Sequence, residues 1–147
     1  MSLTLRPATM DDATILLHWR NDPETRAMSS DTSEIATEDH MAWLAKRVKG
    51  RRDLGAIFIA KLDGTPIGTG RIDRKWDALA LKMDSCLLGY SLDPGWRGQG
   101  YGKQLVSALV REAQLMGYGS VGCRIKRNNV KSLLCAVNGG VNHIELF

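Results

Sequence analysis

A glycine-rich basic run is the segment of this 147-residue sequence most able to do chemistry. It reads Arg-Gly-Gln-Gly-Tyr-Gly-Lys from Arg97 to Lys103, between an apolar segment and an amphipathic one. The N–H groups of a helix's first turn have no partner within the helix and lie at the positive end of its dipole. The three glycines leave those groups open to an anion, and Arg97 and Lys103 add positive charge. We therefore predict a diphosphate-binding turn that opens a helix.

Two familiar nucleotide sites are excluded by the spacing of these glycines. Gly98, Gly100 and Gly102 do not fit G-x-G-x-x-G, and the G-K-[ST] that ends a nucleoside-triphosphate loop is absent. A plain loop that leads into a helix is the simpler alternative.

The cysteines predict neither a metal site nor a disulfide framework. Cys86, Cys123 and Cys135 are odd in number and lack C-x-x-C spacing. We expect them to be small core residues of a protein in a reducing compartment.

The elements around the turn predict one mixed α/β domain over residues 1–147. Apolar spacing and turn residues predict strands at 3–6, 56–60, 67–72, 86–92, 121–126 and 144–147, and helices at 11–20, after an N-cap at Thr37, at 100–116 and at 129–139. Asp63-Gly64 predicts a hairpin turn between the strands at 56–60 and 67–72. Residues 24–36 are expected to form a loop with one helical turn, and 74–84 a polar connection. The strand–helix–strand portion from Cys86 to Lys126 should be parallel.

Composition and charge limit the partners. Hydrophobic residues are 44% and charged residues 24% of the chain, which is typical of a globular domain. No apolar run approaches the ~20 residues that cross a bilayer, and no secretory signal begins the chain, so we expect a cytoplasmic protein with no membrane partner. The net charge is +4 and the basic residues are dispersed, which argues against nucleic-acid binding and fits a small anionic ligand.

With these elements in place, the sequence resembles a known family. The run from Arg97 to Gly102 matches the R/Q-x-x-G-x-G/A signature of the GCN5-related N-acetyltransferases (GNAT), and Asn129-x-x-Ser132 followed by Gly140 is similar to the family's next helix. The resemblance implies the GNAT-like acyl-CoA N-acyltransferase fold, a central mixed twisted sheet with flanking helices. It also implies acetyl-CoA as acetyl donor and a small-molecule primary amine as acceptor.

The resemblance assigns cofactor roles residue by residue. Main-chain groups of Tyr90 to Leu92 would pair with the pantetheine arm, and the Leu92 amide would polarise the acetyl carbonyl. Amides from Gln99 to Lys103 would hold the pyrophosphate, and Asn129 would contact the cofactor, cap its helix, or both. The implied cofactor-binding residues are Tyr90, Ser91, Leu92, Arg97, Gly98, Gln99, Gly100, Tyr101, Gly102, Lys103, Asn129 and Ser132.

The acid and the base are less defined. Many members place a tyrosine acid four residues after the matching Ser132, where this chain has Ala136. Either another group protonates the thiolate or none is needed, because a coenzyme A thiolate is a fair leaving group. The candidate bases are Glu34, His40, Asp73 and Asp84. The alternatives are a surface or capping role for His40 and a solvated turn carboxylate at Asp73.

A second resemblance concerns the acceptor. The segment Trp19-Arg20-Asn21-Asp22-Pro23, with the residues from Glu38 to Leu44, is similar to family members that act on aminosugar nucleotides and to others that act on the N-termini of ribosomal proteins. It implies substrate contacts from Arg20, Asn21, Glu34, Arg71 and Arg74. An aminosugar nucleotide is the favoured acceptor. A protein N-terminus, or a domain that binds acetyl-CoA without turnover, is the alternative.

The last residues carry one more expectation. Members of the family usually add a strand after the one that Ile144 begins, so we expect the C-terminal strand to be missing. A truncated chain, an open sheet edge, or a second subunit that completes the sheet in a homodimer would each explain this.

Overall fold

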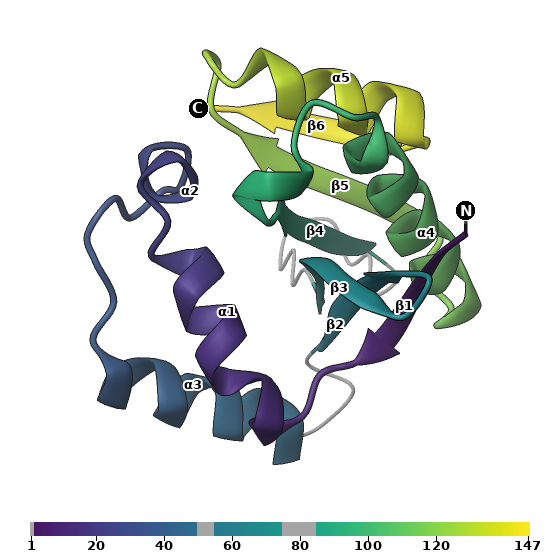
Figure 1. The fold of residues 1–147 in the computed structure, drawn as a ribbon. Helices are drawn as coiled ribbons and strands as arrows, with labels where there is room; N and C mark the ends of the chain where they lie inside the picture. The colour runs from purple at the N-terminus through teal and green to yellow at the C-terminus, as the bar shows by residue number, and fades with distance from the viewer. Residues whose placement is uncertain (1, 50–54, 75–84) are drawn as a thin grey trace.

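The computed structural model describes residues 2–49, 55–74 and 85–147. In this part of the chain six strands form one sheet, in the order β1-β2-β3-β4-β5-β6 (Figure 1). The elements are β1 (Leu3–Pro7), η1 (Met10–Asp12), α1 (Ala13–Arg20), α2 (Pro23–Ala27), α3 (Thr37–Lys49), β2 (Gly55–Leu62), β3 (Thr65–Arg74), β4 (Ser85–Leu92), η3 (Pro94–Trp96), α4 (Tyr101–Leu115), β5 (Ser120–Ile125), α5 (Val130–Gly139) and β6 (His143–Leu146). This confirms the predicted mixed α/β fold.

The sheet is mixed in the predicted way. Strands β1 to β4 pair antiparallel, whereas β4 with β5 and β5 with β6 pair parallel. Asp63 and Gly64 join β2 to β3, and both have positive φ, 48° and 86°. Two such residues form the tight turn whose twist matches that of the flanking strands. The predicted hairpin is therefore confirmed.

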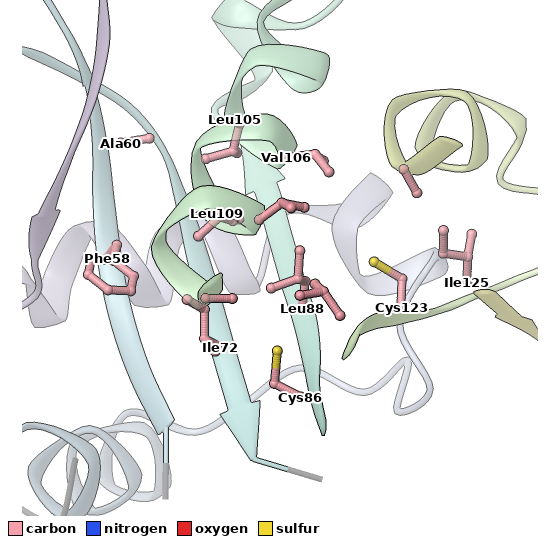
Figure 2. Packing of buried hydrophobic residues seen from close by; sticks show 14 of the residues in the cluster. Phe58, Ala60, Ile72, Cys86, Leu88, Leu105, Val106, Leu109, Cys123 and Ile125 are labelled. Atoms are coloured by element: carbon pink, nitrogen blue, oxygen red, sulfur yellow. The ribbon is translucent and has the colours of Figure 1, made fainter. Parts of the chain in front are cut away.

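Each face of the sheet has its own apolar cluster. Along β2, Phe58 and Ala60 belong to the cluster that α4 covers, and Ile57 and Ile59 belong to the cluster beneath α1 and α3. This follows from the two-residue period of a strand, whose side chains point alternately to opposite faces. Figure 2 shows Leu109 of α4 above β3 and β4. One helical layer thus includes α4 and α5, and the other α1 and α3 (Figure 1).

Two boundaries differ from the prediction, and the helical turn expected near the start of the loop is the helix α2. Residues Pro23–Ala27 form the helix α2, because Asp22 caps it by accepting from Thr25 N–H at 3.1 Å and proline suits a helix's first position. The carbonyl of Ala36 accepts from His40 N–H, so Thr37 lies within α3 and is not its cap. Strand β3 continues to Arg74, and the remaining residues of the predicted polar connection lie outside the described part of the chain.

Strand β6 pairs with β5 along one side and is the last strand of the described sheet. Its main chain runs parallel to β5 from His143 to Leu146. Pairing of two such edges in a homodimer stays a prediction. Within the described residues, no helix has both the length and the apolarity to cross a bilayer, and no cluster of metal-ligating side chains occurs.

Candidate functional site

The register of β4 decides which of its main-chain groups are used within the sheet. Asp93 N–H donates to the Ile67 carbonyl at 2.8 Å, and Leu92 lies opposite Gly68. Bonded and non-bonded pairs alternate along an antiparallel ladder. The polar main-chain groups of Leu92 and Tyr90 therefore point away from β3, and those of Ser91 point toward it.

On its other side, β4 loses its neighbour over its last residues. The pairing of β4 with β5 runs from Ser85 to Leu88 and from Ser120 to Cys123, and goes no further. Tyr90 and Leu92 lie beyond it, so their N–H and C=O groups face a stretch where β5 does not pair. An extended polar chain can bind there as an added strand does.

The Tyr90 side chain connects this stretch to α5. Its hydroxyl lies 2.8 Å from the Ser132 hydroxyl and 3.1 Å from the Ser132 carbonyl, to which it donates. Burial raises the pKa of Tyr90, against the opposing effect of the Ser132 hydrogen bond. The phenol therefore stays protonated at neutral pH. The structure thus brings together two predicted cofactor residues that are 42 positions apart.

The predicted diphosphate turn leads directly from β4 into α4. Gly98 and Gly100 have φ of 75° and 86°, a left-handed conformation that favours glycine, and a Cβ at either position would meet nothing within 4 Å. Gly100 is the residue before α4, so the first N–H groups of the helix open beside this free space. Tyr101 packs edge-on against Trp96 with ring centroids 5.8 Å apart. The aromatic contact thus anchors the start of α4, while the space beside the glycines stays free, as an anion site requires.

Helix α5 forms the adjoining wall. Asn129 caps it by accepting from Ser132 N–H at 3.3 Å, which confirms the capping role; its cofactor role stays a prediction. A Cβ at Gly102 would lie 2.8 Å from the Cys135 sulfur, so a larger residue there would require the Cys135 side chain to shift. Ala136 is fully buried. Position 136 therefore supplies no acid in place of the tyrosine that many family members have there.

Two predicted bases are held by other contacts. His40 is 3% exposed, and its Nε2 lies 3.0 Å from the Ala13 carbonyl. Asp73 accepts from Arg71 Nε at 2.8 Å and also binds the Arg47 guanidinium. These placements favour structural roles for both, tying α3 to α1 and to β3. Of the other candidates, Glu34 is exposed and Asp84 lies outside the described residues.

A cluster of arginines lies between the α1–α2 corner and β3. Burial lowers the pKa of Arg20, and the like charges of Arg71 and Arg26 lower it further, against Asp31. Arg20 donates to the Asp31 carbonyl through Nη2 at 3.0 Å, whereas its buried Nη1 has no hydrogen-bond partner among the described residues. A buried guanidinium nitrogen without an acceptor is costly. An anion bound between these arginines would offset their like charges. Arg74, also predicted here, is the last residue of β3.

The Asn21 side chain is occupied by the main chain. Its amide donates to the Ile35 carbonyl at 2.9 Å and accepts from the Ile35 N–H at 2.8 Å. This fixes the segment before α3 against the end of α1. It places Glu34 at a hollow of about 470 Å³ with Thr14, Leu17, His18, Asn21, Asp22 and Pro23. The α1 residues of that hollow lie roughly opposite the buried Leu16 and Trp19 on the helix, so it opens away from the sheet.

Two contacts across this site were not predicted. Trp19 Nε1 donates to Asp93 Oδ2 at 2.8 Å, and Arg97 Nη2 donates to Asp22 Oδ2 at 2.9 Å. Each joins residues more than 70 positions apart. Local spacing does not reveal such pairs. The only sequence signal is that Trp19 and Asp22 lie near the end of α1, while Asp93 and Arg97 flank the short helix η3.

Known proteins resemble this chain in sequence and fold. A family model for the acetyltransferase (GNAT) domain matches residues 2–141. No curated protein matches the chain.

Solved structures show the same fold. AAC(6')-Ib, solved with paromomycin and acetyl-CoA, is 21% identical with a TM-score of 0.81, and the match covers 95% of this chain and 82% of that one. A ribosomal-protein-alanine N-acetyltransferase from Brucella melitensis is 24% identical with a TM-score of 0.75, over 93% of this chain and 83% of that one. The protein yncA from Salmonella typhimurium, solved with its cofactor acetyl-CoA, is 19% identical with a TM-score of 0.76, over 95% and 79%.

Proposed function

Because the chain belongs to the acetyltransferase (GNAT) domain family, an N-acetyltransferase family that uses acetyl-CoA, we propose that its acceptor is the primary amine of an aminosugar nucleotide. The family settles the reaction class and the acetyl donor, and the residues below support the acceptor. The observation that carries the acceptor is the gathering of like charges at Arg20, Arg71 and Arg26.

The donor site fits the residues that the structure brings together. The unpaired edge at Tyr90 and Leu92 offers main-chain N–H and C=O groups to the amides of a pantetheine arm. The open turn at Gly98 and Gly100 offers helix N–H groups to a diphosphate. Along the chain the β4 edge is followed by the turn. A ligand with a polar arm and a diphosphate can therefore bind the edge with its arm and the turn with its diphosphate.

Acetyl-CoA supplies an acetyl thioester. A C–N bond to the amine forms, the C–S bond breaks, and coenzyme A leaves as a thiolate that the proton lost by the amine converts to the thiol. The Leu92 N–H is the group we assign to the acetyl oxygen, because it points out of the β3 ladder and has no β5 partner. A fixed donor aimed at an oxygen that gains negative charge stabilises the transition state. We assign no base role to His40 or Asp73, since His40 Nε2 and both Asp73 carboxylate oxygens are bonded within the protein.

The acceptor side carries positive charge where a phosphorylated amine needs it. Arg20 lies at about the same angle on α1 as the buried face, toward the sheet, whereas the hollow lined by Glu34 opens on the opposite side. Guanidinium groups bind phosphate oxygens through two parallel hydrogen bonds. A nucleotide diphosphate between Arg20 and Arg71 would compensate the like charges gathered there.

A thiol-release assay with a panel of amines tests the acceptor. The panel contains a UDP-linked 4-amino sugar, the same sugar without its nucleotide, a small aliphatic amine and a peptide with a free N-terminus. We expect the highest kcat/KM for the nucleotide-linked sugar, and a loss of at least tenfold, about 1.4 kcal/mol, when the nucleotide is removed. Equal turnover of all four amines, or faster turnover of the peptide, would contradict the proposed acceptor. Tight binding of acetyl-CoA without turnover of any amine would favour a binding domain.

A further inference from the structure

The corner between α1 and α2 is bonded to the segment that leads into the diphosphate turn at two places. Trp19, which is 1% exposed, donates its indole N–H to Asp93. Asp22 accepts from Arg97. We call Trp19, Asp22, Asp93 and Arg97 the corner clamp. We propose that these are positioning residues: the clamp holds the glycine turn in its diphosphate-binding geometry and fixes it relative to the acceptor side.

The two carboxylates of the clamp each serve two segments at once. Asp22 Oδ2 caps α2 through Thr25 N–H at 3.1 Å and accepts from Arg97 at 2.9 Å. Asp93 Oδ1 caps η3 through Gly95 N–H at 2.8 Å, while its Oδ2 accepts from Trp19 at 2.8 Å. A residue that caps its own element and bonds the other one fixes both position and direction. Movement of either segment must therefore break a cap or a cross-link.

Within the corner clamp, Arg97 has a different role from the cofactor contact that the sequence predicted. Its guanidinium donates to Glu24 at 2.8 Å and to Thr25 Oγ1 at 3.1 Å, in addition to Asp22. Two carboxylates face its single positive charge, and its side chain is 23% exposed. Burial alone would raise the pKa of Asp22, but hydrogen bonds from Thr25 N–H and Arg97 lower it overall. Arg97 thus binds α2 and acts on a diphosphate through the turn that follows it.

The clamp also reaches the acceptor residues. Arg20 lies between the two clamp residues of the corner, and Arg26 lies on α2, which Arg97 holds. This part of the inference rests on the proposed function. Loosening the clamp should therefore weaken the binding of both substrates: that of the donor through the turn, and that of the acceptor through the arginines.

Direct binding of coenzyme A separates positioning from direct contact. If Arg97 bound the diphosphate itself, removing the charge of Asp22 would release its guanidinium and tighten binding. If Arg97 acts by positioning, Asp22→Asn and Arg97→Gln should both weaken binding of coenzyme A, each by about tenfold, since hydrogen bonds between charged groups are among the stronger ones. Isothermal titration of the purified full chain with coenzyme A measures this without any acceptor.

A double-mutant cycle adds a readout that general destabilisation would not give. Asp22→Asn with Arg97→Gln should weaken binding no more than either change alone, because both break the same bond. Glu24→Gln removes only the exposed partner of Arg97 and serves if Asp22→Asn fails to fold; we expect about a threefold loss. Asp12→Asn, which breaks the remote Arg6–Asp12 pair, is the control and should leave the coenzyme A affinity unchanged.

Weaker binding in both single variants, with a non-additive double variant, supports the clamp. Tighter or unchanged binding in Asp22→Asn, or in Glu24→Gln where that variant replaces it, overturns it. Failure to acetylate any aminosugar nucleotide would overturn the proposed acceptor while leaving the coenzyme A result, and with it the donor half of the clamp, in force.

Discussion

The layer of α4 and α5 and the layer of α1 and α3 differ in the atoms that form their sites. On the first side the candidate donor site consists of main-chain groups: the β4 edge at Tyr90 and Leu92, and the turn at Gly98 and Gly100. On the second side the candidate acceptor site consists of side chains, chiefly arginines from elements far apart in the sequence. A main-chain site depends on strand register and on φ angles that few residue types can adopt. A side-chain site can be formed by many different sequences.

The largest effect should come from a change in the turn itself. Gly100→Asp places a carboxylate where the diphosphate belongs and puts a non-glycine residue at φ 86°. Since like charges brought together cost several kcal/mol, coenzyme A affinity should fall by at least about a hundredfold. Titration with coenzyme A measures the loss.

Gly64→Asp is the matched control for this change. Gly64 has the same φ of 86°, and a Cβ there also meets nothing within 4 Å, but it lies in the β2–β3 hairpin. It reproduces the backbone strain of about 1–2 kcal/mol without the site. Equal loss of binding in both variants would mean that strain, and not the position of the turn, explains the result.

On the acceptor side, we expect the substitution of one arginine to change KM for one class of substrate only. Arg20→Gln removes a guanidinium whose Nη1 has no partner in the described chain. We expect KM for a UDP-linked amino sugar to rise about tenfold, because charge-assisted bonds to phosphate are lost, with KM for a small amine unchanged. Steady-state kinetics on the two acceptors measure the split.

Arg124→Gln is the control on β5, two strands away from Arg71 of β3 in the sheet order. Arg124 is exposed on β5 and lies 3.6 Å from Glu145. Exposed ion pairs of this kind contribute little, so neither KM should change. A rise in KM for both amines in Arg20→Gln would indicate a general loss of structure and would remove the support for an anionic acceptor.

The fold was predictable in its order because the strands and helices carry their own periodic patterns. The site was predictable where it is made of main chain: the glycines near position 100 and the strand before them are local features. It was not predictable where it depends on tertiary contacts. Nothing in the sequence near His40 says that the Ala13 carbonyl occupies its ring, and nothing near Arg97 says that α2 lies against it.

A smaller effect is expected at an ion pair outside both sites. Asp12 accepts from both Arg6 guanidinium nitrogens at 2.9 Å, and hydrogen bonding to Arg6 is the main cause that lowers its pKa. A carboxyl whose pKa is lowered on folding contributes stability above its unfolded pKa of about 3.9, and loses it as the pH falls through the folded value. Asp12→Asn should therefore cost about 1 kcal/mol at pH 7. The difference between wild type and variant should shrink below pH 4 in urea unfolding, and a constant difference would contradict this assignment.

The smallest effect should come from Tyr90→Phe, which changes a side chain on the donor side. The phenol bonds Ser132 across the unpaired end of β4, so its loss should cost about 1 kcal/mol in unfolding free energy. If the coenzyme A thiolate needs no acid in order to leave, kcat should fall by no more than about threefold, well short of the ~10²-fold at which general acid catalysis begins. Ser132→Ala removes only the hydroxyl partner and keeps both the phenol and its bond to the carbonyl of residue 132, so it should cost less stability than Tyr90→Phe and leave kcat as little changed. A hundredfold lower kcat in Tyr90→Phe alone would make this phenol the acid that Ala136 cannot supply, and would give the donor side one side chain as decisive as those of the acceptor side.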